Sequence, residues 1–322
     1  MYSISFSPTK HNLDLFENDF IKLKNFLKEF KLNKLELMMF DDEIIKKIPK
    51  DMVSGAHLIF WPMWIDFYDG NINLVEKHLG NKENIKNYYG SLDKNILKNT
   101  YIKQIKQAIK LNAKYVVIHI SNVYPKESVL LDYKNNNKYI IDRSIEFINE
   151  VLKELSFCDI DILFENLWSN GLTFLDDELS LYFIESIEYK NKGFLLDLSH
   201  LIITNHEIKN ENEACSYIKE KTKNIKKYIK GIHINRTAFN DYINKDYKML
   251  YEDYMNLKDD NYKRYKLLIN HMKSLDPHLP YLHNSLKEII EYINPLYKNL
   301  EISFNSKSEL ENILNEQIKY LY

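Results

Sequence analysis

Eight short apolar segments, each followed by a helical pattern or a long loop, constrain the fold of this 322-residue chain more than any other feature. Residues 193–196, Gly-Phe-Leu-Leu, show no polar alternation, which is typical of a strand buried on both faces of a parallel sheet. Alternating strands and helices favour βαβ units, and eight such units fit a closed barrel in a chain of this length. We therefore predict an α/β protein with a (β/α)8 TIM barrel. Its strands are expected at residues 2–7, 35–40, 56–61, 115–120, 161–166, 193–197, 231–235 and 300–304.

The connections between these strands decide between two architectures. An open doubly wound sheet is the alternative, but the Gly-rich phosphate turn that usually follows its first strand is missing, and the chain has only seven glycines. We expect a single TIM-barrel domain over residues 1–322, with loops at 62–92 and 126–138. The polar, tyrosine-rich residues 236–273 are interpreted as a helical or irregular insertion after the seventh strand, acting as a lid or a subunit contact. Helices are expected at residues 12–30, 96–111, 140–155, 179–187, 212–228, 286–293 and 308–321.

The charge balance narrows the range of partners. Lys and Arg number 44 against 46 Asp and Glu, which gives a formal net charge of −2, and only three of the basic residues are arginines. Because nucleic acids and anionic membranes are usually bound by an excess of positive charge, we expect neither as a partner. Residues 241–266 of the insertion contain six basic and six acidic residues, so they form no track for phosphates. We expect a small-molecule substrate and leave a homo-oligomer open.

The N-terminus and the cysteines indicate a location. The first residues contain no basic segment followed by a long apolar one, and no run approaches the roughly 18 apolar residues of a membrane helix. Two cysteines, Cys158 and Cys215, do not make a disulfide framework, so a reducing environment is the default. We expect a soluble cytoplasmic protein.

Acidic and histidine residues recur at or near the carboxyl ends of the predicted strands. A barrel gathers such positions at one mouth. Buried acids and imidazoles without a cation would suffer strong like-charge repulsion and desolvation, and a divalent metal relieves both. Taken alone, each could be a hydrogen-bonded packing residue, or a helix cap in the case of Asp197, but one cause shared by six strands is the simpler account. The residues are His57, His119, Glu165, Asp197 with His200, His233 and Glu301.

Several of these segments, in this order, resemble motifs of the xylose isomerase-like TIM-barrel superfamily. That superfamily includes sugar and sugar-phosphate isomerases and epimerases, inosose dehydratases and endonuclease IV. The segments are Val117–His119, Phe164–Asn166, Leu196–His200, Gly231–Asn235 and Leu300–Ile302. Asp276–Pro280, followed by Leu286–Ile290, is similar to the segment before the last strand. The resemblance runs from the first strand to the final helix and leaves the insertion outside it.

The resemblance implies a set of metal ligands. The superfamily's usual ligands correspond to Glu165, Asp197, His233 and Glu301, with His200 as a further ligand or a substrate contact. The additional ligands of its multinuclear members correspond to His57, His119, Asp276 and His278. One to three divalent ions are implied, of Mn, Zn, Co or Fe. Tyr281–Asn284 stands where the family often has a Gly-x-Gly turn, so a proline-rigidified turn with a solvated histidine is the alternative for Asp276 and His278.

Three further residues are candidates for substrate binding. Trp61 and Trp168 closely follow predicted strands, where flat aromatic rings stack on sugar faces or bases. Arg236 directly follows the seventh strand and is suited to a phosphate or a carboxylate. Packing between loops is the alternative for the tryptophans, and a surface role is the alternative for the arginine.

Four hypotheses for the function follow. The first is a metal-dependent isomerase or epimerase of a small sugar, polyol or sugar phosphate, in which Glu165 and Glu301 move protons and His200 orients a hydroxyl group. The second is a multinuclear phosphodiester hydrolase of the endonuclease IV type, which the ligand set supports and the charge balance opposes. The others are a multinuclear iron oxidase that modifies a peptide and a barrel kept for binding alone. About one metal ion per chain would favour the isomerase, and two or three would favour hydrolysis or oxidation.

Overall fold

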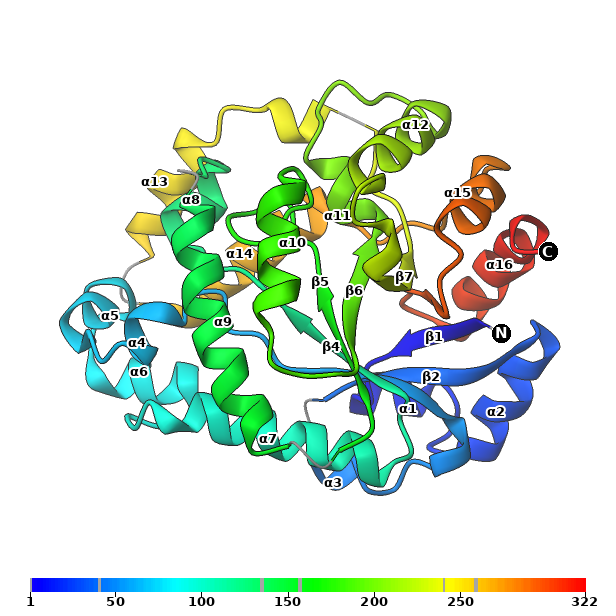
Figure 1. Cartoon of the computed structure of the whole chain (residues 1–322), viewed down its shortest axis with the longest axis horizontal. Coiled ribbons are helices and arrows are strands. Elements are labelled where there is room, and N and C mark those ends of the chain that lie inside the picture. Colours follow the sequence, from blue (N-terminus) through cyan, green and yellow to red (C-terminus); the bar gives the residue numbers. More distant parts are fainter. Residues whose placement is uncertain (1, 40–41, 134–135, 156–157, 240, 258–259) are drawn as a thin grey trace.

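Eight parallel strands close into a barrel in the computed structural model, which describes residues 2–39, 42–133, 136–155, 158–239, 241–257 and 260–322 (Figure 1). Neighbouring strands pair in chain order, and the first strand also pairs with the eighth, which closes the sheet. The predicted (β/α)8 barrel is confirmed. The strands are β1 (Tyr2–Phe6), β2 (Leu32–Met38), β3 (Val53–His57), β4 (Tyr115–His119), β5 (Asp161–Glu165), β6 (Lys192–Asp197), β7 (Ile229–Ile234) and β8 (Tyr297–Leu300).

Helices cover the outside of the barrel and bury their apolar faces. In α9 (Asn137–Lys153), Ile140, Phe147 and Val151 recur at helical spacing and are all buried. None of the described helices combines the length and apolarity needed to cross a membrane. The α-helices are α1 (Lys10–Asp14), α2 (Phe20–Glu29), α3 (Asp42–Ile45), α4 (Ile65–Tyr68), α5 (Ile72–Leu79), α6 (Lys82–Tyr89), α7 (Asn95–Lys110), α8 (Pro125–Leu130), α9 (Asn137–Lys153), α10 (Asp177–Ser186), α11 (Leu198–Ile203), α12 (Glu211–Thr222), α13 (Lys248–Asn256), α14 (Asn261–Leu275), α15 (Ser285–Ile293) and α16 (Lys307–Gln317). Single turns of 3-10 helix are η1 (Lys50–Met52), η2 (Lys226–Tyr228), η3 (Asp241–Asn244) and η4 (Ile318–Tyr320).

Alternate strand residues point outward under the helices and inward toward the barrel axis. Outward-facing Ile118 and Phe164 belong to the large core between barrel and helices. A separate apolar cluster, the interior plug, consists of Tyr115, Val117, Leu163 and Leu195, with Tyr297 packed against it. Because side chains alternate, the next inward positions after the plug on β4, β5 and β6 are His119, Glu165 and Asp197. The alternation that builds the plug therefore also aims these polar side chains at the axis.

The third strand begins earlier than the apolar pattern predicts. β3 covers Val53–His57, whereas the pattern indicated residues 56–61. The pattern missed the start because Gly55 is untypical of a strand, yet a side chain there would collide with the ring of Tyr115 inside the barrel. His57 therefore ends its strand and lies at the carboxyl mouth.

The eighth strand is displaced in the same direction. β8 covers Tyr297–Leu300 instead of residues 300–304. Its inward-facing Asn299 hides the strand in the sequence, because this polar side chain donates a hydrogen bond to Oγ of Ser5 (2.7 Å) across the barrel interior. Glu301 follows the strand directly instead of lying within it.

The second strand also starts early, at Leu32 rather than at residue 35, and ends at Met38. Phe40, the end of the predicted strand, lies outside the described residues. Glu36 lies in the middle of β2 and is fully buried, although it is acidic.

The helix predicted over residues 12–30 is in fact two helices. Glu17 and Asn18 separate α1 from α2 and have φ angles of 56° and 58°, in the left-handed region. Asp19 then caps α2, because its side chain accepts hydrogen bonds from the first free backbone N–H groups. The hydrophobic period continues through the break, so the pattern alone predicts one helix.

The loops predicted at residues 62–92 and 126–138 contain helices. The first holds α4, α5 and α6, and most of α8 lies in the second. α5 buries Val75, and α6 buries Ile85 and Tyr89. These helices are rich in Asn and Lys, so their apolar stripes are too sparse for the periodicity to reveal them.

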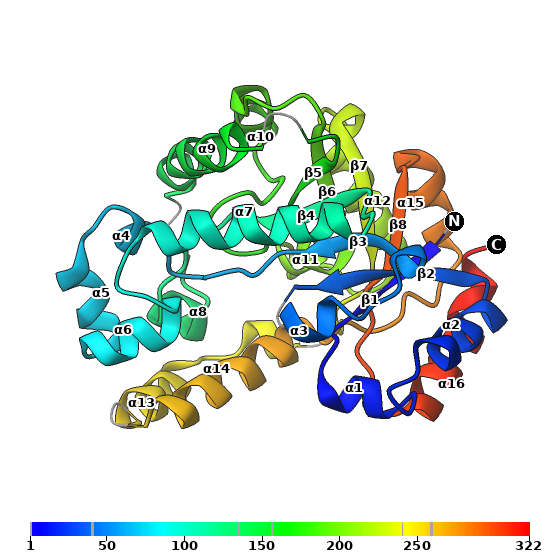
Figure 2. The same cartoon turned by 90° about the horizontal axis from the view of Figure 1, so that it is seen from below.

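Segments that follow β3, β4 and β7 gather on one side of the molecule. In both views α4–α6, α8, α13 and α14 lie together, on the side opposite the chain termini (Figures 1 and 2). α13 and α14 both contact α8. Because each of these segments follows the carboxyl end of a strand, they extend that mouth of the barrel on one side. Residues 236–273 include η3, α13 and most of α14, and their role as a lid or a subunit contact stays a prediction.

Replacing Gly55 by alanine is expected to destabilise the fold. The added methyl group would lie inside van der Waals contact with the ring of Tyr115, 2.6 Å from its Cε1 atom. Overpacking of this kind costs roughly 1–3 kcal/mol in the free energy of unfolding, which chemical denaturation measures. In a Tyr115→Ala background the same change should cost much less, because the colliding ring is gone. Equal costs in the two backgrounds would contradict the steric explanation.

Candidate metal centre

Nine acidic and histidine side chains lie close together at the carboxyl mouth of the barrel. They form three groups, and within each group the possible ligand atoms all lie within 4.8 Å of one another. Glu165 is shared by two of the groups. All nine residues that the sequence put forward as metal ligands are brought together here. Group A is His57, His119 and Glu165; group B is Glu165, Asp197, His233 and Glu301; group C is His200, Asp276 and His278.

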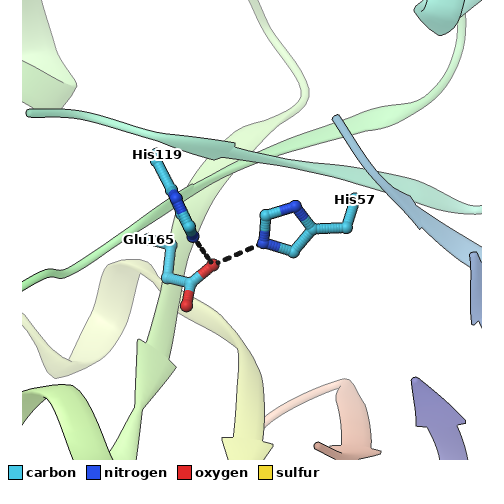
Figure 3. Close-up of side chains that lie close together, drawn as sticks. All are labelled: His57, His119 and Glu165. Carbon is cyan, nitrogen blue, oxygen red and sulfur yellow. Dashed lines mark hydrogen bonds and ion pairs between the residues drawn. The ribbon is translucent and has the colours of Figure 1, made fainter. Parts of the chain in front are cut away.

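Group A is arranged around one carboxylate oxygen (Figure 3). Nε2 of His57 lies 3.1 Å and Nε2 of His119 lies 3.0 Å from Oε2 of Glu165. The three residues end β3, β4 and β5, and His119 is the register partner of Glu165. Nδ1 of His57 lies 3.1 Å from the carbonyl oxygen of Leu58, to which it can only donate. In the neutral ring the unprotonated nitrogen therefore faces the carboxylate.

Group B lies on the barrel axis and is deeply buried. Nδ1 of His233 is 2.8 Å from Oε2 of Glu301, 3.4 Å from Oε1 of Glu165 and 3.6 Å from Oδ2 of Asp197. His233 and Asp197 are themselves register partners on β7 and β6. Three carboxylates thus converge on one imidazole nitrogen.

Asp197 combines two roles. Its Oδ1 atom accepts a hydrogen bond from the backbone N–H of His200 (2.8 Å), which is the helix cap that the sequence allowed as an alternative. Its Oδ2 atom accepts one from Nδ2 of Asn235 (2.8 Å) and lies within group B. Because the two oxygens do different things, the cap and membership of group B are compatible.

Group C depends on a segment with an uncommon backbone conformation. Oδ2 of Asp276 lies 3.1 Å from Nε2 of His200 and 2.8 Å from Nε2 of His278. His278 has a φ angle of 48°, in the left-handed region, where residues with side chains are uncommon and often functional. A short antiparallel bridge between Arg236 and Leu279 holds this segment beside the end of β7. His278 thus faces a buried carboxylate rather than solvent alone.

Two of the histidines, His57 and His200, are oriented as metal ligands usually are. Nδ1 of His200 donates to the carbonyl of Asn166 (2.8 Å), as His57 does to Leu58, while the other ring nitrogen faces an acid. Metal-bound histidines commonly donate their outer N–H to such acceptors. In each case two atoms with lone pairs face each other, which is unfavourable unless a proton or a cation lies between them.

The donor set fits a divalent metal ion. Nδ1 of His233 and Oε1 of Glu165 are buried and make no hydrogen bond of acceptable geometry within the described part of the chain, although each is close to other polar atoms of group B. Imidazole and carboxylate ligands together suit Zn, Mn, Co or Fe. The residues present can therefore hold one ion at each group.

The groups also shift one another's pKa values. Burial opposes ionisation of Glu165, but the neighbouring His119 and His233 rings outweigh it and hold the pKa of its carboxyl well below the usual value. Burial likewise disfavours charged His200 and His233, yet adjacent carboxylates raise the pKa of both rings well above 6.5. In the same way the carboxylate beside His278 overcomes burial and raises the pKa of that ring to about 10. Metal binding must displace these protons and is therefore favoured by higher pH.

A family model described as a xylose isomerase-like TIM barrel matches residues 89–292, which is more than half of the chain. The chain belongs to this family. His57 and Glu301 lie outside the matched span, and the other seven residues of the three groups lie within it. The resemblance deduced from the sequence motifs is confirmed.

Solved structures of similar fold cover almost the whole chain at low sequence identity. Endonuclease IV from Thermus thermophilus superposes with a TM-score of 0.56 at 11% identity, over 99% of this chain and 98% of that one. D-Psicose 3-epimerase from Clostridium cellulolyticum gives 0.51 at 13% identity, over 99% and 96% of the two chains. 3-Keto-D-glucoside 4-epimerase from E. coli gives 0.53 at 10% identity, over 99% and 98%. No curated protein matches this sequence. At these identities the likeness concerns the fold alone.

The two tryptophans predicted as substrate contacts have different surroundings in this xylose isomerase-like barrel. Trp61 is only 7% exposed, its ring stacks on Tyr101, and its indole N–H donates to the carbonyl of Tyr88 (3.2 Å). These contacts account for Trp61 by packing alone. Trp168 lies edge-to-face against His200, with ring centroids 4.8 Å apart. Trp168 is therefore the better placed of the two to contact a substrate, and this role stays a prediction for both.

Arg236 is held by its neighbours. Its Nε atom lies 3.5 Å from Oε1 of Glu211, and Nη1 donates to the carbonyl of Thr237 (3.1 Å). The guanidinium group also lies over the ring of Phe239. An anionic substrate group would have to compete with Glu211 for this charge, and anion binding by Arg236 stays a prediction.

Sequence reasoning missed the residues that orient the nine side chains. Oδ1 of Asn166 accepts a hydrogen bond from the backbone N–H of Asp197 (2.8 Å), and Asn235 bonds the side chain of the same residue. Glu36 contacts the far side of His233. The available signals were an asparagine directly after a strand in the first two cases and a lone acid in an apolar run in the third.

Proposed function

We propose that this chain is a divalent-metal-dependent hydrolase of phosphate esters that uses ions at all three groups. The observation that carries the proposal is that nine residues complete three adjoining groups rather than one. The isomerase expected first from the sequence needs only group B for a single ion. It leaves His57, His119, Asp276 and His278 without a role in the chemistry.

The three groups adjoin closely enough to act on one substrate group. Glu165 belongs to groups A and B, and Nδ1 of His200 in group C lies 3.3 Å from Oε1 of Glu165. Bound ions would act as Lewis acids on a phosphate oxygen. They would also lower the pKa of a bound water molecule, so that it could act as a nucleophile at neutral pH. A phosphate ester carries several oxygens on one atom, so it matches several cations placed side by side.

The chain's own residues would hold the ligand side chains in place and keep water away from the site. Asn166 and Asn235 hold Asp197 in place, and the Leu58 and Asn166 carbonyls hold the rings of His57 and His200. Trp168 covers one side of His200 and limits access of water there. A site held this rigidly favours one geometry of the reacting groups.

A second candidate is a metal-dependent isomerase or epimerase of a small sugar, polyol or sugar phosphate. Group B supports it, because four residues suffice for one ion, and Glu165 and Glu301 both approach Nδ1 of His233 with oxygens that can move protons. The near-neutral charge also favours a small substrate over duplex nucleic acid for either candidate. Cytoplasmic location stays a prediction.

Metal content and ester cleavage test the proposal together. The protein, purified without chelator or metal-affinity tag, is expected to contain about three ions per chain by elemental analysis and to release 4-nitrophenol from bis(4-nitrophenyl) phosphate. A panel of ketohexoses is incubated in parallel and analysed by chromatography. About one ion per chain together with sugar epimerisation would refute the hydrolase proposal and support the isomerase. Iron as the bound metal, with no ester cleavage, would favour the peptide oxidase.

A further inference from the structure

Glu36 is a buried acid that belongs to none of the three groups. It lies on β2, is 0% exposed and points into the barrel, below group B and next to the interior plug. Burying an ionised carboxylate is strongly unfavourable unless hydrogen bonds and a charged partner compensate for it. The contacts of Glu36 must therefore explain how a buried carboxylate is stabilised at this position.

Glu36 contacts the outer edge of the His233 ring. Its Oε1 and Oε2 atoms lie 3.0 and 3.1 Å from Nε2 of His233, while Nδ1 on the opposite edge lies 2.8 Å from Oε2 of Glu301. An ionised carboxylate can only accept hydrogen bonds. Contact with Glu36 therefore places the N–H of the neutral ring on Nε2 and directs the unprotonated Nδ1 into group B.

Glu36 itself is held by donors from the barrel interior. The hydroxyl group of Tyr115 donates to its Oε2 atom (2.7 Å), and Oγ of Ser5 donates to Oε1 (3.4 Å). Asn299 in turn donates to Ser5 (2.7 Å). Gly55 leaves the space in which the Tyr115 ring lies. Glu36 is thus held directly from β1 and β4, and residues of β8 and β3 support these two contacts.

The acceptor behind His233 differs chemically from those behind His57 and His200. His57 and His200 donate to neutral backbone carbonyls, whereas His233 donates to a carboxylate. A charged acceptor makes the imidazole a stronger electron donor at its opposite nitrogen. An ion at group B would benefit from this effect, and ions at groups A and C would not.

We propose that Glu36 is a positioning residue that fixes the tautomer and orientation of His233 and thereby strengthens metal binding at group B. The inference rests on the metal centre of the proposed function, but it does not depend on which reaction that centre performs. A purely structural Glu36 would affect stability without affecting one group of ligands more than the others.

The test is metal binding by the Glu36→Gln variant of the full chain. Glutamine keeps the size of the side chain and removes its charge. Equilibrium dialysis against buffered Zn²⁺, with elemental analysis, is expected to show one of the bound ions held roughly 10–100-fold more weakly and the others unchanged. Loading with Co²⁺ gives a second readout, because the visible absorption of the ion at group B should change as its ligand field weakens.

Asp66→Asn is the matched control. Asp66 is also a buried carboxylate that accepts a hydrogen bond from a tyrosine hydroxyl, that of Tyr124 at 2.7 Å, but it lies on α4 away from the three groups. Circular dichroism and thermal unfolding monitor the fold of both variants. Asp66→Asn should bind Zn²⁺ as the unchanged protein does.

Unchanged affinities in a folded Glu36→Gln variant would overturn the inference, and so would equal weakening of all the ions. Should Glu36→Gln fail to fold, Tyr115→Phe decides, because it removes only the hydroxyl group that holds Glu36: selective weakening of one ion supports the inference, and unaltered binding overturns it. A protein that binds no divalent metal would overturn both proposals. Selective weakening without any ester cleavage would refute the proposed function and leave the role of Glu36 standing.

Discussion

Replacement of Glu165 by glutamine is expected to reduce ester hydrolysis at least ~10³-fold, because metal ions contribute several kcal/mol to such reactions and this residue serves two of the three groups. An amide has one oxygen in place of two and no charge. Elemental analysis should therefore show the loss of ions from groups A and B, leaving about one ion per chain. The fold should be largely retained, which circular dichroism checks.

His278→Asn gives the contrast for this prediction. His278 belongs to group C only, so its replacement should remove about one ion and leave the other groups loaded. His283→Asn is the matched control, since that histidine lies outside the groups and contacts Ser285 instead. Retained turnover in Glu165→Gln would exclude Glu165 from the reaction. The same metal content in Glu165→Gln and His278→Asn would contradict the division into three groups.

Removal of the metal is expected to make stability strongly dependent on pH. In the metal-free chain, carboxylates overcome burial and raise the pKa values of His200 and His233 well above 6.5, and that of His278 to about 10. A raised histidine pKa stabilises the fold fully below the unfolded value near 6.5, and this contribution is lost as the pH rises toward the folded value. The thermal midpoint of chelator-treated protein should therefore fall as the pH rises from about 6.5 to about 10.

The loaded protein should behave in the opposite way. Metal binding needs unprotonated imidazoles, so the difference in thermal midpoint between loaded and chelator-treated samples should widen as the pH rises. Chelator-treated His278→Asn should show a shallower decline, because one of the titrating rings is gone. A thermal midpoint of the metal-free chain that is constant over this range would mean that the three rings do not carry raised pKa values.

The sequence was sufficient to predict the barrel and most residues of the three groups because these depend on local patterns. Short apolar runs mark strands, and a polar residue at the end of such a run marks the mouth of a barrel. His119, Glu165 and Asp197 each end a strand that the apolar pattern places within a residue or so. Family resemblance added Asp276 and His278, which lie in an irregular segment without such a pattern.

What the sequence could not show depends on contacts between distant residues. Glu36 is meaningful only beside His233, which lies 197 residues further along the chain. Gly55 and Asn299 obscured the starts of β3 and β8, because each serves an inward contact with another strand. The orientation of the Trp61 side chain could not be predicted from the sequence either, because packing against Tyr101 decides which way its ring points.

The distribution of the group B residues over neighbouring strands has a consequence for the maturation of this protein. The four residues of group B come from β5, β6, β7 and the position directly after β8, so they meet only once these four strands have paired with one another. A nascent or partly assembled chain therefore lacks the complete group B. We therefore expect the ion at group B to bind late in folding. Once bound tightly, it would stabilise the pairing of these strands against local unfolding.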